Sequence, residues 1–237
     1  MSRTLSMIAV LVVLCQTTFS QSTLASDSLL RQHSNALQFQ IADKSILQPF
    51  MGTTISFKHH VDRFTAYRFG VSMSLNTSSN DGTSSAFSGG SESSSNNNSG
   101  TLTMISIQVS GQKLWYTDTP TGVFLFCGAG PFIGFSLTSN NYDTRFRSGG
   151  TTVLTGTTEQ TVTGLTAGAS ALVGVEWFAS TAISLHAEYG ISAQYSWTKT
   201  STTSNSSTPG TYSKDEGHFG NWQLAGNGVR FGLSVYF

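Results

Sequence analysis

The chain has 237 residues, of which 12 are basic and 12 acidic, so its formal net charge is zero. Charged residues make up 10% of the chain, against about 25% in a typical soluble protein. This balance of charge gives no indication of a nucleic-acid or acidic partner. An aromatic content of 11% argues against disorder throughout.

The N-terminus has the features of a secretory signal peptide. A basic start is followed by the apolar run MIAVLVVLC at residues 7–15 and then by small polar residues. Such a run is typical of a signal peptide, and it is shorter than the about 20 residues that a membrane-spanning helix needs. We expect residues 1–20 to be removed, with cleavage near Ser20 or, as the second choice, near Ala25. Residues 21–35 would then form an N-terminal arm.

Eight later stretches alternate apolar and polar side chains with a period of two, as expected of strands with two different faces. In chain order they are Ala36–Ile41, Met51–Val61, Thr65–Leu75, Leu102–Tyr116, Val123–Leu137, Thr163–Phe178, Ala182–Trp197 and Trp222–Phe237. The first is short for a complete strand, and the fourth has a clear apolar register only at its centre, so a bulge is an alternative there. Pro131 removes a ladder donor from the fifth.

The connections between these stretches alternate in length. Short turns follow the second, fourth and sixth stretches, and long polar segments follow the third, fifth and seventh. This asymmetry is typical of a barrel in a bacterial outer membrane, with short periplasmic turns and longer external loops. An even number of strands places both chain ends on the periplasmic side. We expect flexible loops at Asn76–Gly100, Thr138–Gln160 and Lys199–Asn221.

The sequence ends on VRFGLSVYF, a strand pattern that continues to the last residue. Because lipid offers no hydrogen bonds, a sheet in a membrane must close on itself. We therefore expect the last strand to pair with the first. The side chains predicted to face lipid are Val229, Phe231, Leu233, Val235 and Phe237.

These features resemble the outer-membrane β-barrel protein family, in particular its small eight-stranded OmpA-like and OmpX-like type, over residues 36–237. The chain's end is similar to the insertion signal that the barrel assembly machinery reads, through Arg230, Gly232, Val235 and Phe237. The resemblance implies an all-β fold, a single closed antiparallel up-and-down transmembrane β-barrel, placed in the outer membrane as a monomer. It also implies contact with outer-membrane lipid and, during biogenesis, with the assembly machinery and periplasmic chaperones. Residues 21–35 would lie in the periplasm.

The polar faces of such a barrel would fill its lumen. Charges held in a lumen of low dielectric constant need partners, because desolvation is costly. We therefore expect ion pairs of Glu176 and Glu188 with Arg68, Arg230 and Lys58, although the sequence does not assign the pairs. The predicted lumen charge network is Lys58, His60, Arg68, Glu176, His186, Glu188 and Arg230.

Aromatic residues are predicted to form belts at the two membrane interfaces, where an apolar ring with a hydrogen-bonding group is favoured. The parity of Trp222 places it inward unless a bulge intervenes. The predicted girdle is Tyr67, Trp115, Tyr116 and Trp177 on the periplasmic side and Tyr195, Trp197 and Trp222 on the external side.

The sequence holds little that indicates catalysis. His186 and Glu188 share a strand face, as a base and its orienting carboxylate would, but no third partner is identifiable. His59 and His60 point to opposite faces, which disfavours a shared metal site, and no zinc spacing, phosphate loop or nucleophile motif is present. The segment Gly128–Gly134 is only superficially like a phosphate cradle, and we interpret its glycines as space for neighbouring rings. We expect no enzyme activity, no cofactor and no metal.

The sequence thus favours an integral outer-membrane barrel with a structural or surface-interaction role through flexible external loops, its lumen plugged by ion pairs. No ligand of the loops can be named from their composition. The first alternative is a narrow passive pore for ions or very small solutes. An enzyme that acts on membrane lipids and a soluble secreted β protein are the more distant alternatives.

Overall fold

The computed structural model describes residues 34–42, 53–88, 91–117, 119, 123–148, 151–206 and 212–237. The predicted signal peptide, with its cleavage sites near Ser20 and Ala25, and nearly all of the predicted arm lie outside these residues. No helix long and apolar enough to span a membrane is present in the part of the chain that the structure describes.

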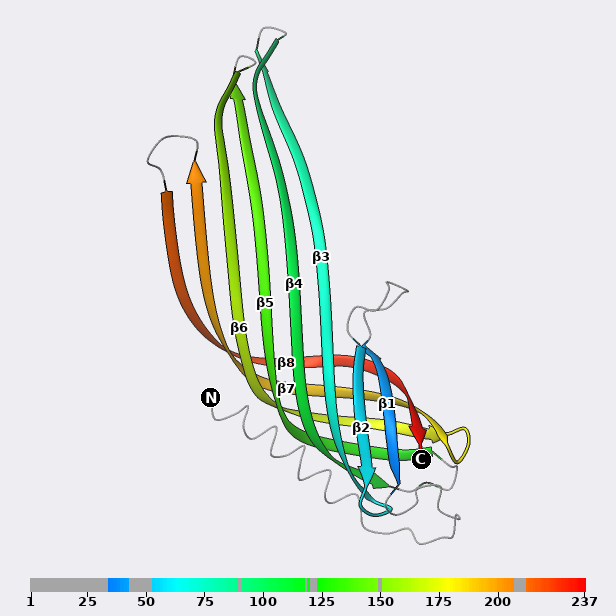
Figure 1. Ribbon diagram of the computed structural model, residues 1–237. Helices are drawn as coiled ribbons and strands as arrows, with labels where there is room; N and C mark the ends of the chain where they lie inside the picture. Colours follow the sequence, from blue (N-terminus) through cyan, green and yellow to red (C-terminus); the bar gives the residue numbers. More distant parts are fainter. Residues whose placement is uncertain are drawn as a thin grey trace.

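Eight antiparallel strands form one closed barrel, in which each strand pairs with its neighbours in the chain and the last returns to the first (Figure 1). This confirms the predicted fold, and each of the eight predicted stretches overlaps one strand. The strands are β1 (Asn35–Ala42), β2 (Thr53–His60), β3 (Thr65–Ser88), β4 (Ser91–Thr117), β5 (Val123–Ser148), β6 (Thr151–Phe178), β7 (Ile183–Ser206) and β8 (Tyr212–Tyr236).

The barrel closes through β1 and β8, as the pattern of the last strand predicts. Their register runs from Ala36 opposite Tyr236 to Ala42 opposite Arg230. Phe237 donates its N–H to the carbonyl of Asn35 at 2.9 Å and accepts the N–H of the same residue at 3.2 Å. The two ends of the described barrel are therefore bonded to each other through the last residue of the sequence.

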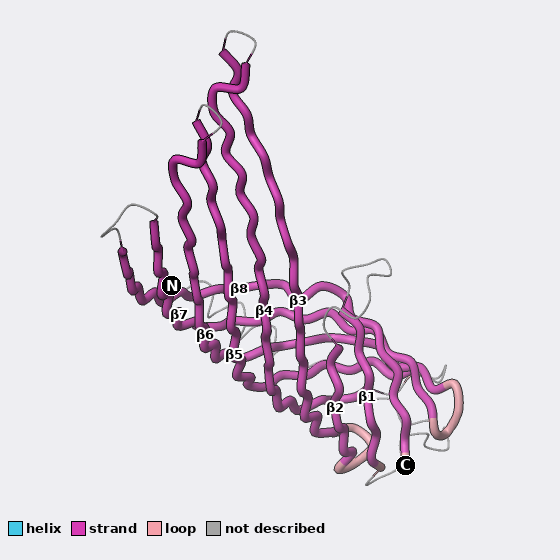
Figure 2. The backbone as a smooth tube through the Cα atoms, turned by 45° about the horizontal axis from the view of Figure 1, so that its top comes forward, coloured by secondary structure: helices cyan, strands magenta, loops and turns pink. Residues whose placement is uncertain are grey.

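Six of the strands are far longer than the sequence pattern indicates. The predicted flexible loops are instead β-hairpins that continue β3 to β8 beyond the barrel as a curved sheet (Figures 1 and 2). The β3–β4 ladder, for example, extends to Ser88 opposite Ser91. The alternation of apolar and polar residues is absent there because neither face of the extension covers an apolar core. Residues 77–84 of β3 are exposed throughout, and one face of β4 is half-buried at residues 97–100. Main-chain pairing and the β propensity of threonine hold these segments extended without an apolar face.

The short strands limit how far the barrel is closed. The β2–β3 ladder ends at Thr53 opposite Met73, and the β1–β8 ladder ends at Arg230. Beyond these points the outer edges of β3 and β8 have no ladder partner among the described residues. From the two ends of the described chain up to this level the sheet is a closed ring. In the hairpin extensions beyond it, the sheet is open and has two edges.

A bulge in β8 places Trp222 on the outside of the barrel. Tyr189 pairs with Val229 but Ile191 pairs with Gly226, so β8 carries one extra residue. Gly228 in this bulge has a φ of 68°, a left-handed conformation that glycine adopts at little cost. The parity of β8 changes here, and Trp222 lies against Tyr195 with ring centroids 5.0 Å apart. The bulge considered for Leu102–Tyr116 is absent, since neither ladder of β4 shifts its register within this range.

Glycines of β6 make room for the phenylalanines of β5. A Cβ atom on Gly174 would lie 2.5 Å from Cζ of Phe126 and 2.7 Å from the carbonyl oxygen of Ala187. Gly168 stands in the same relation to Phe132. The space for the rings comes from the neighbouring strand rather than from the Gly128–Gly134 segment, where the sequence placed it.

We expect Gly174→Ala to lower the free energy of unfolding by about 1–3 kcal/mol, because the new methyl group overlaps a ring and a main-chain oxygen. Urea unfolding of the refolded barrel in lipid, followed by tryptophan fluorescence, measures the change. Gly82→Ala is the matched control, since nothing lies within 4 Å of the added Cβ there. Equal stability of the two variants would contradict the packing argument.

Candidate functional site: the barrel lumen

A buried carboxylate, Glu176 on β6, is the centre of the periplasmic half of the lumen. Lys58 Nζ lies 2.8 Å and 2.9 Å from its two oxygens, and both side chains are almost fully buried. The hydroxyls of Tyr116 and Tyr236 donate to it at 3.0 Å and 2.8 Å, and Ser184 donates to it as well. A carboxylate buried this deeply is stable only with such a complete set of charged and hydroxyl donors.

Apolar and aromatic side chains surround this cluster. Phe124 meets Phe178 edge-on at 5.4 Å, Phe178 packs on Tyr236 at 5.1 Å, and Tyr116 packs on Phe126 at 5.4 Å. Lys58 lies 4.9 Å from the centre of the Tyr236 ring and 5.6 Å from that of Tyr116. The cation is therefore held by two ring faces as well as by its carboxylate. These residues fill the periplasmic end of the barrel.

A second ion pair lies one layer toward the external side. Arg68 on β3 binds Glu188 on β7 through both terminal nitrogens, at 2.7 Å and 3.3 Å. Its Nε donates to Oε1 of Gln112 at 2.9 Å, and Gln112 in turn donates to Ser170 at 3.0 Å. A forked pair of this kind is among the stronger charged contacts in proteins. The structure thus assigns the pairs that the sequence left open, as Lys58 with Glu176 and Arg68 with Glu188.

The two lumen histidines are held differently. His186 Nε2 lies 3.0 Å from the side-chain nitrogen of Gln40, and its Nδ1 lies 3.4 Å from Oγ of Ser234. Glu188, considered as its orienting carboxylate, is bound to Arg68 instead. His60 packs against the rings of Tyr116 and Tyr236, and its two nitrogens have no hydrogen-bond partner among the described residues. Neither arrangement provides a base with an accessible nucleophile.

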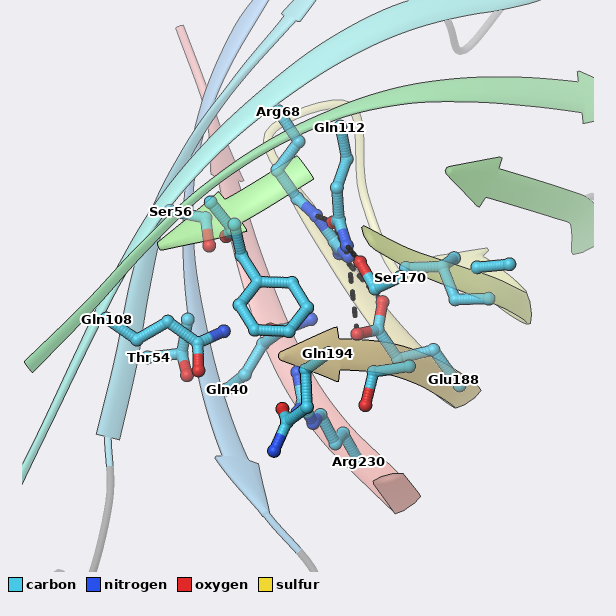
Figure 3. Close-up of a pocket in the computed structure, with 16 residues that line it drawn as sticks. Gln40, Thr54, Ser56, Arg68, Gln108, Gln112, Ser170, Glu188, Gln194 and Arg230 are labelled. Carbon is cyan, nitrogen blue, oxygen red and sulfur yellow. Dashed lines mark hydrogen bonds and ion pairs between the residues drawn. The ribbon is translucent and has the colours of Figure 1, made fainter. Parts of the chain in front are cut away.

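A polar cavity of about 100 Å³, here called the lumen cavity, lies inside the barrel, and Figure 3 shows the side chains that line it. The Arg68–Glu188 pair borders it, and each of the eight strands contributes to its wall. Most of its lining is hydroxyl or amide, from serines, Thr54 and four glutamines. Arg230, the remaining member of the predicted charge network, also borders it. Among the described residues no group of three or more His, Cys, Asp or Glu side chains is placed to hold a metal ion.

The predicted girdle residues divide between the outer surface and the lumen. Tyr67 and Trp177 are exposed on the outside at the periplasmic end, where Trp115 is half-buried with Lys113 5.4 Å from its ring centre. The external group is a cluster in which the Tyr195 ring contacts both Trp197 and Trp222. The prediction that Tyr116 belongs to the girdle is wrong. It is only 2% exposed, because its even position on β4 points inward to Glu176.

The outer surface of the barrel is apolar and the inner surface is polar. Large apolar side chains stand exposed on the outside of every strand, among them Phe39, Phe57, Val71, Ile107, Ile133, Val175, Leu185 and Leu233. Lys58, His60 and Glu176 are fully buried inside. This is the reverse of a water-soluble protein, and it is the distribution that a lipid environment requires. The chain has the fold and the surface of a transmembrane β-barrel.

The barrel has a band of apolar surface with the height of a bilayer. On β7 the band runs from Leu185, beside Trp177, to Trp197 in the external aromatic cluster. At the usual rise and tilt of a barrel strand this segment spans roughly 30 Å. The hairpin extensions of β3 to β8 therefore lie beyond this band.

Several solved structures have a similar arrangement of strands. CarO2 of Acinetobacter baumannii is 9% identical with a TM-score of 0.40, over 88% of this chain and 100% of that one. A major outer membrane protein of Thermus thermophilus is 14% identical with a TM-score of 0.38, over 87% and 100%. Neisserial surface protein A is 17% identical with a TM-score of 0.30, over 87% and 95%. Neither a family model nor a curated protein matches the chain. Scores this low carry no statement about function.

Several lumen residues were not identified from the sequence. Tyr236 and Ser184 are not among the predicted lumen residues, yet they donate directly to Glu176. Gln112, which anchors Arg68, lies in a strand whose register was clear only near its centre. Parity could have found Gln112, because it is even-numbered like the lumen residues of β4. Side chains from four other strands converge on Glu176, and no pattern within any one strand of the sequence predicts this convergence.

We expect Glu176→Gln to lower the free energy of unfolding by about 3–5 kcal/mol, because it leaves Lys58 as an unpaired buried cation. Adding Lys58→Met to this variant should recover part of the loss, since the remaining polar groups are then uncharged. Urea titration of the refolded barrels measures both effects. Glu216→Gln, which breaks only exposed contacts such as that with Lys214, serves as the control and should leave the midpoint unchanged. A Glu176→Gln midpoint equal to that of the control would contradict the role of the buried pair.

Proposed function

We propose that this outer-membrane protein is a sealed, non-enzymatic anchor that presents a polar β-sheet to the exterior for a structural or surface-interaction role. The observation that carries the proposal is the extension of β3 to β8 far beyond the closed ring (Figure 2). This sheet has a rich supply of exposed Ser, Thr and Asn side chains, and the paired strands give it a defined shape. Surface segments held on a rigid scaffold commonly carry binding functions.

The filling of the lumen supports the sealed state. The Glu176 cluster and its aromatic neighbours occupy the periplasmic end with side chains that are almost fully buried. An eight-stranded barrel is only just wide enough to be filled by its own side chains. An ion would have to separate Lys58 from Glu176 in a medium of low dielectric constant, which is costly. The buried pairs therefore act as a plug in this proposal.

Insertion and assembly belong to the same proposal. Arg230, Gly232, Val235 and Phe237 would act as the signal for the barrel assembly machinery, after transport by periplasmic chaperones. Val235 and Phe237 are exposed on the outside of the barrel, where an assembly factor could contact them before lipid does. Gly232 also has a packing role, because a Cβ there would overlap the ring of His186. We propose a monomer, with a complete ring of eight strands and lipid as its main contact.

We expect no single-channel current from the wild-type barrel refolded into a planar lipid bilayer. Tyr116→Ala combined with Phe126→Ala removes two stacked rings of the plug and should produce discrete openings. A denaturing gel of heated and unheated samples checks that both proteins are folded. Reproducible openings of the wild type would contradict the sealed barrel and favour the narrow-pore alternative.

We expect a membrane-impermeant maleimide to label Ser79→Cys on intact cells, because this residue lies in the exposed β3 extension. Thr181→Cys in the turn between β6 and β7 should react only after the outer membrane is permeabilised. The wild-type chain gives the background from its own cysteines. Labelling of Thr181→Cys on intact cells would reverse the assigned orientation.

A hairpin-trimmed variant tests the surface role. Deleting residues 81–99 joins Asn80 to Gly100, which are partners in the β3–β4 register, and creates an Asn-Gly turn suited to a two-residue hairpin. The variant should still insert into the membrane, and its mobility on a denaturing gel should still change when the sample is heated. Cells that display the variant should aggregate less than cells that display the wild type. They should also adhere less to protein-coated glass. Equal adhesion would exclude this part of the sheet as the interaction surface.

A further inference from the structure

The lumen cavity contains one more positive charge than negative charge. Arg68, Glu188 and Arg230 are the charged side chains among its lining residues. Arg68 and Glu188 neutralise each other through their forked contact. Arg230 stands opposite Glu188 in the β7–β8 register but forms no ion pair or hydrogen bond with the described residues. In Figure 3 dashed lines join Arg68, Gln112, Ser170 and Glu188, and none reaches Arg230.

The Arg230 side chain also has a buried donor without an acceptor. Its Nε–H is shielded from solvent and has no hydrogen-bond partner among the described residues. A buried unsatisfied donor is costly, and more so when it is charged. The side chain lines the cavity and is only partly exposed. An acceptor that enters the cavity would remove this cost.

The remaining lining suits a small ligand with oxygen atoms. Gln108 offers an amide group. Gln194 offers its amide oxygen, since its nitrogen donates to Gln223, and the Ser110 hydroxyl, which donates to the carbonyl of Gly70, can accept a hydrogen bond. Burial along the inner face of β7 decreases from Glu188, which is buried, to Gln194, which is half-buried. A solute can therefore reach the cavity from the external side, while the Glu176 cluster closes the other side.

We propose that the lumen cavity binds a small monocarboxylate that carries a hydroxyl group, with the Arg230 guanidinium as its main partner. A guanidinium presents parallel N–H donors that match the two oxygens of a carboxylate. A single negative charge balances the cavity, whereas a dianion such as phosphate would leave it negative. The hydroxyl would take the amide and serine groups that the carboxylate does not use. The site is independent of the proposed function, because a sealed and a conducting barrel would both contain it.

Lactate is the probe, and the Arg230 Nε–H resonance is the reporter. The full-length barrel, refolded in detergent and labelled with nitrogen-15, is titrated and followed by two-dimensional NMR. We expect this resonance to shift with a Kd on the order of 1 mM, typical of a small and weak ligand. Arg230→Gln should weaken binding about tenfold or more, as seen from the remaining lumen signals. Arg145→Gln makes the same charge change at an exposed site on the β5 extension and should leave the Kd unchanged.

Gln108→Leu keeps the test independent of assembly, because Arg230 also belongs to the predicted insertion signal. This variant removes one amide from the wall and should weaken lactate binding severalfold without changing the C-terminal strand. Glycerol, which has no charge, and inorganic phosphate complete the comparison and should both bind more weakly than lactate. An unshifted Arg230 signal, or glycerol binding as tight as that of lactate, would overturn the proposal. Tighter binding of phosphate would overturn the assignment to a monocarboxylate.

Discussion

Closure of the main-chain hydrogen-bond ring is the constraint on which the rest of this structure depends. Water satisfies the free edge of a sheet, but lipid does not, and each unpaired main-chain group in a membrane costs several kcal/mol. The β1–β8 ladder, with the reciprocal bonds between Asn35 and Phe237, removes that cost at the periplasmic end. Once the ring is closed, every strand has one face toward lipid and one toward the lumen.

The closed ring determines the character of the lumen. Polar faces turned inward have little water to bind, so they must satisfy one another. Glu176 meets this requirement with a lysine, two tyrosines and Ser184, each from a different place in the sequence. Arg68 meets it with a carboxylate and an amide. Arg230 is the exception, and an unsatisfied charged group in an otherwise paired network is the kind of site at which function is expected.

Outside the membrane the same strands follow different rules. Water can bond to the free edges of β3 and β8, so the ladders need not close there. Both faces of the outer strands can be polar, because no apolar solvent and no core has to be covered. The aromatic cluster of Tyr195, Trp197 and Trp222 lies between the closed barrel and the open extension. Its position depends on the single extra residue of the β8 bulge, which turns Trp222 outward.

The sequence by itself determined the fold class, the number and order of the strands, their direction and which side chains face lipid. Each of these follows from alternation with a period of two and from short and long connections, which are local properties. It also determined that Lys58, Arg68, Glu176 and Glu188 point inward, because parity depends only on position within a strand.

Only the tertiary structure decided which of these charges meet, since pairing depends on register between strands far apart in the chain. It also decided that Tyr116 of β4 donates to Glu176 of β6, since these two strands are not neighbours in the barrel. The external hairpins were unpredictable for a physical reason. Their strands cover neither lipid nor an apolar core, so no apolar periodicity marks them. Main-chain pairing with a neighbouring strand leaves no pattern in the sequence of a single segment.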